Sequence, residues 1–293
     1  MIQTCYMDQT KKKPRNRNII RNLNKDLKSL NHWLLANKIS LNSTKTELII
    51  FRNKKTKIPK LDIKLNGTKL KETDNVKYVG IIFDKHLSFS SHIGIMNAKL
   101  KKANNLIAIS RHYLSQELLL QIYYGQFYSH LTYGCQLWGH SQIDQTITLQ
   151  KKAVRLMTFS HFQAHTSPLF KQLKLLKLPD IISSNNIIFT HNTLNNQSPT
   201  IFKDYFKPKQ IKHRQFSLNT QLSMPNGSLE IPVYETTAGN KSIKFICVTE
   251  WNQIHRELSI DNFPKYSENS FWLQMTNSKN LKYILKNHFI NKY

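Results

Sequence analysis

The sequence predicts an α+β protein, in which a helix on a small antiparallel sheet is followed by a helical module and a mixed, basic C-terminal region. Apolar residues recur at helical spacing before residue 37 and again after residue 90, whereas the short apolar or alternating runs between them are typical of strands. The chain has 293 residues, of which 40% are hydrophobic. It is therefore long enough for two or three modules and apolar enough to bury cores.

The first helix is expected over residues 18–36. Its apolar residues are spaced three and four positions apart, so they form one stripe of an amphipathic helix and leave the lysines outside that stripe. The stripe consists of Ile20, Leu23, Leu27, Leu30 and Leu34.

Short strands are expected between this helix and residue 90. Residues 47–51 predict a short buried strand, and residues 76–83 predict a mostly apolar one. Between them, residues 61–70 contain Asn66-Gly67, which is a strong signal for a type I′ hairpin turn. Helix and strands together indicate one helix-on-sheet unit.

A module of about three helices is expected over residues 91–160. The three helices are predicted at residues 91–113, 118–131 and 144–159, from their apolar periodicity. The first of them has an exposed basic face with Lys99, Lys101 and Lys102.

The region after residue 160 gives weaker signals. A fourth helix is expected at residues 185–195, after Pro179-Asp180 as a helix start. A last small unit is indicated by the apolar run 243–248 and by a terminal helix at residues 280–293.

The charge of the chain points to its partner. There are 43 Lys and Arg against 17 Asp and Glu, which gives a formal net charge of +26. Such a surplus makes the folded chain repel itself, and a polyanionic partner is the usual reason for it. Nucleic acid is therefore favoured over a merely solvated basic surface and over an anionic membrane. Residues 1–17 form a basic arm that is either a nuclear localisation signal or a flexible tail.

Two kinds of sequence feature that the chain lacks indicate where it is located in the cell. No apolar stretch approaches the roughly 20 residues that a membrane span needs, so no membrane partner is expected. The cysteines Cys5, Cys135 and Cys247 are far apart and form no disulfide framework and no metal pair. Nucleus or cytoplasm is the expected location.

No motif provides an evident active site. The 17 acidic residues include no adjacent pair and no Asp-x-Asp pair that could hold two metal ions. Asp74 and Asp84 flank the strand predicted at residues 76–83 and are expected to cap turns rather than to bind metal. His161 and His165 have no carboxylate or cysteine near them in the sequence, so solvated or core histidines are favoured over a zinc site. Composition and spacing alone predict a nucleic-acid-binding protein.

Residues 33–51 sharpen this interpretation. They closely resemble the W-x-x-x-N-K-L-S-L-N-x-x-K-T-x-x-x-x-F block of non-LTR (LINE/jockey-like) retrotransposon reverse transcriptases. Further blocks similar to this family follow in the family's order up to about residue 260. They are V-K-Y-V-G-I at 76–81, L-S-F-S-S-H-I at 87–93, Y-G-C-Q-L-W-G at 133–139, L-Q-K-K-A-V-R at 149–155, H-T-S-P-L-F at 165–170 and N-K-S-I-K-F at 240–245 with Trp251-Asn252.

The resemblance implies part of a polymerase. Residues 18–90 would be a partial palm, residues 91–160 the helical thumb and residues 161–293 a basic C-terminal extension. The fingers and the upstream palm are expected to be missing, so the chain is expected to be a truncated piece of such an enzyme.

The resemblance also implies RNA or an RNA–DNA duplex as the partner, held through its phosphate backbone. Tyr78-Val79-Gly80 would form the primer grip, which positions the primer 3′ end. Lys45 would lie beneath the active site near the leaving pyrophosphate, although a surface lysine after a turn is equally favoured. The expected nucleic-acid-binding residues are Lys38, Lys45, Tyr78, Val79, Gly80, Lys99, Lys101, Lys102, Lys151, Lys152 and Arg155.

In this family, the chemistry uses Mg²⁺ held by aspartates. Tyr6-Met7-Asp8-Gln9 lies about where the family's Y-A-D-D turn belongs. Asp8 would then be a remnant of the catalytic turn, and Gln9 cannot supply the second carboxylate; otherwise the chain has no such turn. No metal and no intact catalytic residue are therefore expected, and the chain is expected to bind nucleic acid without synthesising DNA alone.

Two alternatives remain. The chain is either a polymerase subunit that is active only with a separate upstream fragment, or a noncatalytic nucleic-acid-binding or interaction protein, including a pseudogene product without a stable fold. The first alternative predicts polymerase activity only on mixing the two pieces.

Overall fold

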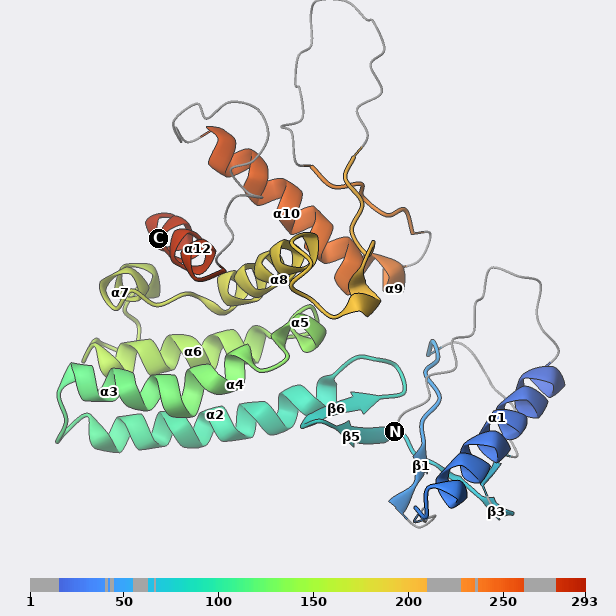
Figure 1. Cartoon of the computed structure of the whole chain (residues 1–293). Coiled ribbons are helices and arrows are strands. Elements are labelled where there is room, and N and C mark those ends of the chain that lie inside the picture. The colour runs from blue at the N-terminus through green and yellow to red at the C-terminus, as the bar shows by residue number, and fades with distance from the viewer. Residues whose placement is uncertain are drawn as a thin grey trace, which may run out of the picture. The chain divides into compact units, whose positions relative to one another are not determined.

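The computed structural model (Figure 1) describes residues 16–39, 42, 45–54, 63–65, 67–209, 228–234, 237–260 and 278–293. Among the described residues, one helix is followed by strands of small sheets, and the rest of the described chain is mainly helical, so the predicted mixture of helix and sheet is confirmed. The chain divides into two compact units, one up to His92 and one from Ile93 onward.

Helix α1 (Asn16–Ala36) confirms the first predicted helix. Leu23 and Leu27, from its apolar stripe, pack against a small core. The buried members of this core are Ile63, Leu65 and Leu70. Burial of each such side chain contributes roughly 1.5–3 kcal/mol, so this cluster is what holds α1 on the strands.

The predicted hairpin is confirmed. Strand β2 (Lys64–Leu65) pairs antiparallel with β3 (Thr68–Lys69), and Leu65 lies opposite Thr68. Gly67 has a φ of 77°, in the left-handed region that the turn requires. Asn66 and residues 61–62 of this prediction lie outside the described residues.

The prediction of one antiparallel sheet with a buried strand at residues 47–51 is wrong. Within the described residues there are three separate two-stranded sheets. Strand β1 (Glu47–Leu48) is only two residues long and pairs in parallel with β4 (Lys71–Glu72). Neither residue of β1 is fully buried, and Phe51 is exposed. A strand with a single partner leaves much of its surface to solvent, which an apolar run in the sequence cannot reveal.

The single strand expected at residues 76–83 is a hairpin. Strand β5 (Asn75–Tyr78) turns at Val79-Gly80 and pairs antiparallel with β6 (Ile81–Asp84). Val79 and Gly80 have φ values of 45° and 80°, as a two-residue type I′ turn demands. β-Branched residues rarely adopt a positive φ, so the valine hides this turn from a prediction based on residue type.

The buried carboxylate of Asp84 shapes the segment that leads from β6 into helix α2 (Ser90–Ser110). Its Oδ2 accepts hydrogen bonds from the backbone N–H groups of His86 and Ser88 and from the Ser88 hydroxyl, each at 3.1 Å, and its Oδ1 accepts one from the Phe89 N–H at 2.6 Å. Leu87 and Phe89 have φ values of 52° and 55°. Because each of these strained residues costs about 1–2 kcal/mol, the carboxylate offsets the strain. The predicted turn-capping role of Asp84 is confirmed; Asp74 instead forms an ion pair with Lys85 at 2.7 Å.

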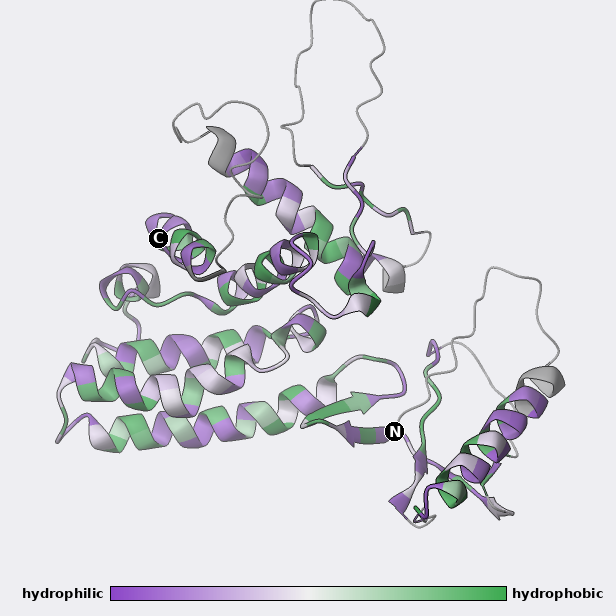
Figure 2. Cartoon of the chain, in the orientation of Figure 1, coloured by the Kyte–Doolittle hydropathy of each residue, from purple (hydrophilic) through white to green (hydrophobic). Residues whose placement is uncertain are grey.

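The first helices of the second unit lie where the sequence predicts helices. In Figure 1, α2, α3, α4 and α6 lie side by side, and Figure 2 shows along them the mixture of polar and apolar residues that burial of one face requires. The helix expected at residues 118–131 contains a π-helical stretch, η2, in its middle. The elements after α2 are α3 (Gln116–Ile122), η2 (Tyr123–Tyr128), α4 (Ser129–Thr132), α5 (Cys135–Trp138) and α6 (Asp144–Met157).

Buried polar side chains join α2 to α6. Asn97 donates to Gln145 at 3.1 Å and accepts from the Thr146 hydroxyl at 2.8 Å, and Asn104 donates to the Leu149 carbonyl at 3.0 Å. Because a buried amide without partners costs about 1–3 kcal/mol, these bonds fix how the two helices pair.

The remaining helices build on α8. It begins at Leu178 with Pro179 in its first turn, as the Pro179-Asp180 start signal indicates, and is longer than the helix expected at residues 185–195. Both α10 and α12 pack against α8. Glu257 of α10 bonds His288 of α12 at 3.1 Å and Lys292, just after α12, at 2.6 Å. The elements are α7 (Thr166–Gln172), α8 (Leu178–Leu194), η3 (Thr200–Phe202), α9 (Thr237–Asn240), α10 (Ile243–Ile260) and α12 (Ser278–Asn291).

We expect Asp84→Asn to destabilise the segment between β6 and α2 by about 1–3 kcal/mol, because an amide cannot accept all four hydrogen bonds. Burial alone would raise the pKa of Asp84, but the hydrogen bonds from Ser88, Phe89 and His86 outweigh it and lower the pKa. Its stabilising contribution is therefore present above the ordinary carboxyl pKa of about 4 and is lost as the pH falls through the lowered one.

Hydrogen exchange of the Ser88 and Phe89 amides between acidic and neutral pH measures this effect. The matched control is Asp74→Asn, whose exposed carboxylate forms an ion pair with Lys85, so exchange of the same amides should change little. Equal protection in wild type and Asp84→Asn would contradict the role of the carboxylate.

Candidate nucleic-acid interface

The tip of the β5–β6 hairpin presents the residues expected to grip a primer. Val79 is 67% exposed, and Tyr78 is half exposed beside it. A valine held at positive φ on an exposed tip is strained, and such strain is commonly found at functional sites. The tip is therefore an exposed, strained turn of the first unit.

Lys38 ends helix α1. The Lys38 N–H donates to the Leu35 carbonyl at 3.0 Å and the Ile39 N–H to the Leu34 carbonyl at 2.9 Å, which together make a Schellman motif. The left-handed position of that motif, usually a glycine, is occupied by Lys38 with a φ of 56°. Its ammonium group is thus presented on an exposed helix end.

Lys45 lies just after a turn, where the structure leaves its side chain exposed. The Lys45 N–H donates to the carbonyl and to the side-chain Oδ1 of Asn42, both at 3.2 Å, and the Thr46 hydroxyl donates to the same carbonyl at 2.9 Å. A role near pyrophosphate stays a prediction. Asp8 and Gln9 lie outside the described residues.

The lysines of α2 are exposed, as the sequence predicts. Lys99 and Lys102 are three residues apart and share one face of the helix, while Lys101 lies to the side. Burial and the positive charge of Lys99 lower the pKa of His130 in helix α4.

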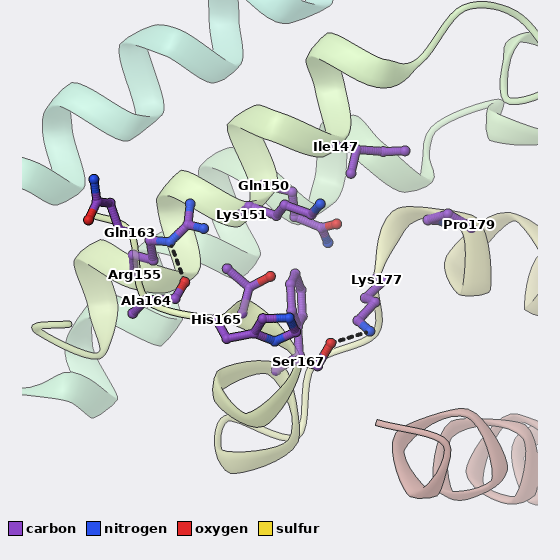
Figure 3. A pocket seen from close by; sticks show the side chains of 12 residues that line it. Ile147, Gln150, Lys151, Arg155, Gln163, Ala164, His165, Ser167, Lys177 and Pro179 are labelled. Atoms are coloured by element: carbon purple, nitrogen blue, oxygen red, sulfur yellow. Dashed lines mark hydrogen bonds between the residues drawn. The ribbon is translucent and has the colours of Figure 1, made fainter. Parts of the chain in front are cut away.

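The basic residues of α6 separate into two groups. Lys151 and Arg155, one helical turn apart, line a cavity of about 430 Å³ (Figure 3). Lys152 is exposed but does not line it. The cavity also contains Lys177 and His165, which the sequence did not assign to a binding site. Lys177 is 26 positions from Lys151, and no spacing rule brings such residues together.

Fixed hydrogen bonds shape this cavity. Arg155 Nε donates to the Ala164 carbonyl at 2.9 Å, and Lys177 Nζ donates to the Ser167 hydroxyl at 3.0 Å (Figure 3). The Lys177 ammonium also lies 3.9 Å from the centre of the Tyr293 ring, a cation–π contact. Two cations are therefore held on opposite sides of the cavity before any ligand arrives.

Gln150 fixes one wall of the cavity. Its buried Nε2 donates to the Tyr123 hydroxyl and to the Leu176 carbonyl, both at 3.0 Å, and its Oε1 accepts from the Leu178 N–H at 2.8 Å. These bonds tie α6 to the segment that carries Lys177. A glutamine on a predicted helix gives no signal of this role in the sequence.

The predicted site residues fall on both units. Lys38, Lys45 and the hairpin tip belong to the first, and the basic residues of α2 and α6 belong to the second. Among the described residues, no three His, Cys, Asp or Glu side chains are grouped so that they could hold a metal ion. No described helix is long and apolar enough to cross a membrane.

Comparison with known proteins identifies similar sequences. The chain is 26% identical over 192 residues to a probable RNA-directed DNA polymerase from transposon X-element of Drosophila melanogaster, which covers 62% of the chain and 21% of that protein. It is 28% identical to RNA-directed DNA polymerases from the mobile element jockey, over 165 residues in Drosophila funebris and 190 in Drosophila melanogaster. Those two matches cover 53% and 61% of the chain, and 18% and 20% of the respective relatives.

The chain thus spans about a fifth of the length of these relatives. No family model matches it, and no solved structure does so at a significant level. The three relatives confirm the resemblance to reverse transcriptases of jockey-like, non-LTR transposable elements that the sequence blocks indicate.

Replacing the strained valine should stabilise the hairpin. We expect Val79→Asn to slow hydrogen exchange of the β5–β6 amides about fivefold, which corresponds to roughly 1 kcal/mol, because Asn-Gly suits a type I′ turn. Val76→Asn, within β5, is the matched control and should speed exchange, since asparagine is unfavourable in strands. Faster exchange in Val79→Asn would contradict the turn assignment.

Replacing Lys38 by glycine should stabilise the end of helix α1 while removing a positive charge. We expect Lys38→Gly to raise the free energy of unfolding of the α1 region by about 0.5–1 kcal/mol, since glycine adopts the left-handed conformation without strain. Lys38→Ala removes the same charge but keeps the β carbon, so it should not stabilise. Local hydrogen exchange at Ile39 measures both variants, and equal gains would show that charge rather than backbone strain is responsible.

Proposed function

We propose that this chain holds RNA or an RNA–DNA duplex as the palm-base and thumb part of a jockey-like, non-LTR reverse transcriptase. In this proposal residues 18–90 serve as part of the palm, residues 91–160 as the thumb and residues 161–293 as a basic extension. The relatives named as RNA-directed DNA polymerases support the family. A location in the nucleus or cytoplasm belongs to the same proposal.

One observation carries the binding part of the proposal. Within the described part of the chain, the basic residues that the sequence assigns to binding on α2 and α6 form no ion pair. Arg52, Lys85 and Lys292, by contrast, do form ion pairs. Helix α2 contains no acidic residue, and α6 contains only Asp144, in its first turn. Unpaired cations can neutralise phosphates without first losing an internal partner, as backbone binding requires. These residues are Lys99, Lys101, Lys102, Lys151, Lys152 and Arg155.

We propose further that the 293 residues by themselves do not extend a primer. Phosphoryl transfer in this family needs Mg²⁺ between aspartates, where the metal stabilises the developing charge. In this sequence the segment that resembles the catalytic turn has Gln9 at the second position, and an amide supplies no carboxylate.

The subunit alternative is favoured by a different observation. The first unit exposes large apolar side chains at the end of α1 and beyond β1, and its two-stranded sheets have open edges. Such surfaces suit a further polypeptide that completes the palm. The exposed residues are Trp33, Leu35, Ile39 and Phe51.

The first test combines a binding titration with primer extension on poly(rA)–oligo(dT). If six basic residues contact phosphates, affinity should fall about a thousandfold between about 50 and 200 mM salt. Replacing one of these residues by glutamine should lower the slope of log affinity against log salt by about 0.9. Lys85→Gln is the control, because Lys85 is paired with Asp74 and should leave the slope unchanged.

Binding without incorporation, in Mg²⁺ or Mn²⁺, is the expected result for the chain alone. Affinity that stays flat with salt contradicts the duplex proposal. Incorporation that disappears in Asp8→Ala contradicts the loss of chemistry, and incorporation that requires an added upstream polymerase fragment selects the subunit alternative.

A further inference from the structure

We propose that the cavity between α6 and α7, together with the loop that joins these helices, binds single-stranded nucleic acid. The cavity would take a phosphate, and the exposed ring of Phe162 would stack on an unpaired base. This inference rests on the proposed nucleic-acid-binding function and adds to it a strand type and a place.

The charge of the cavity selects an anion. Lys151, Arg155 and Lys177 all line it, and none of its lining residues is acidic. Thr166 and Ser167 add hydroxyl groups to the same wall. A phosphate accepts several charge-assisted hydrogen bonds at once, and cations with hydroxyl donors are the groups that provide them.

The cations are both positioned and available. Arg155 uses its Nε to bond the Ala164 carbonyl, and its terminal nitrogens have no hydrogen-bond partner in the described part of the chain. The Lys151 ammonium likewise has none there, and its side chain is exposed. Lys177 is held by Ser167 and the Tyr293 ring, but an ammonium has three donors and retains capacity for a ligand. Figure 3 shows Arg155 and Lys177 on opposite sides, with Lys151 and His165 between them.

The loop that carries the lining residue Gln163 also carries exposed aromatic side chains. Phe162 is 71% exposed, and its ring centre lies 4.4 Å from that of His161. The next residue, Gln163, lines the cavity, so the aromatic pair and the phosphate site are joined by one peptide bond. Phe159, at the start of the same loop, is also exposed and lies under the Arg111 guanidinium at 4.9 Å.

This combination fits a single strand better than a duplex. Bases in a duplex already stack on one another, whereas an unpaired base has a free face that an exposed aromatic ring can cover. A cationic pocket beside aromatic rings is the usual arrangement of proteins that hold single strands. Phe170 lines the cavity but is buried, and the Phe159 ring is covered by Arg111, so we assign the base to the more exposed ring of Phe162.

The test uses the full chain and fluorescence anisotropy with three probes: oligo(rU) of about 12 nucleotides, an abasic strand of the same length and a blunt RNA–DNA duplex. We expect Phe162→Ala to weaken oligo(rU) binding roughly 5- to 100-fold, with no effect on the abasic strand or the duplex. Phe162→Trp should restore binding. Tyr283→Ala, which removes a ring that is 68% exposed on α12, is the matched aromatic control and should leave binding of oligo(rU) unchanged.

A second variant tests the phosphate. Lys151→Gln should weaken both oligo(rU) and the abasic strand and lower the salt slope by about 0.7. Lys171→Gln, an exposed lysine on α7 that does not line the cavity, is the matched control. Both Lys151 and Phe162 are exposed, so these variants should fold, and retained thermal unfolding confirms it.

The outcomes separate the two proposals. If no probe binds, the proposed function itself fails. If the duplex binds with a steep salt dependence but Phe162→Ala leaves oligo(rU) unaffected, only the present inference is overturned. A third outcome is that inorganic phosphate abolishes binding of all three probes equally, while Phe162→Ala has no effect. This result would identify the cavity as a site for free phosphate and would also overturn the present inference.

Discussion

The second unit depends on the buried amide of Gln150. It joins α6 to η2 through the Tyr123 hydroxyl and to the chain before α8 through Leu176 and Leu178. A buried amide costs about 1–3 kcal/mol for each group left unpaired, so helix positions that break these bonds are disfavoured. The hydrogen bonds of Gln150 therefore fix how far the basic residues of α6 lie from Lys177. Because α10 and α12 pack on α8, the position of these last helices depends on the same bonds.

In the first unit, the carboxylate of Asp84 has a structural role similar to that of Gln150 in the second. The carboxylate of Asp84 receives its hydrogen bonds from the segment that contains the strained residues Leu87 and Phe89, and this segment leads directly into α2. Val79 and Lys38 also have positive φ values, and both residues are exposed where nucleic acid is expected. Strain that is retained on a surface is consistent with a functional demand on that surface.

Much of the helical part could be predicted because each helix carries its own periodic signal. The boundaries of α1, α2, α6 and α12 agree closely with the sequence-based expectations, since one buried face per helix imposes spacings of three and four. The strands were harder, because a two-residue strand has no period to recognise. A valine at position 79 is unfavourable for a turn, because β-branched residues rarely adopt a positive φ. The turn is therefore visible only in the backbone conformation.

The sequence by itself determined the family resemblance, the basic character and the identity of the exposed cations on α2 and α6, because order of motifs, charge and helical spacing are all local properties of the chain. The tertiary structure decided which of those cations share a cavity: it grouped Lys151 and Arg155 with Lys177 and left Lys152 outside. The physical reason is that buried hydrogen bonds between segments far apart in the sequence set this arrangement, and no local pattern records such bonds.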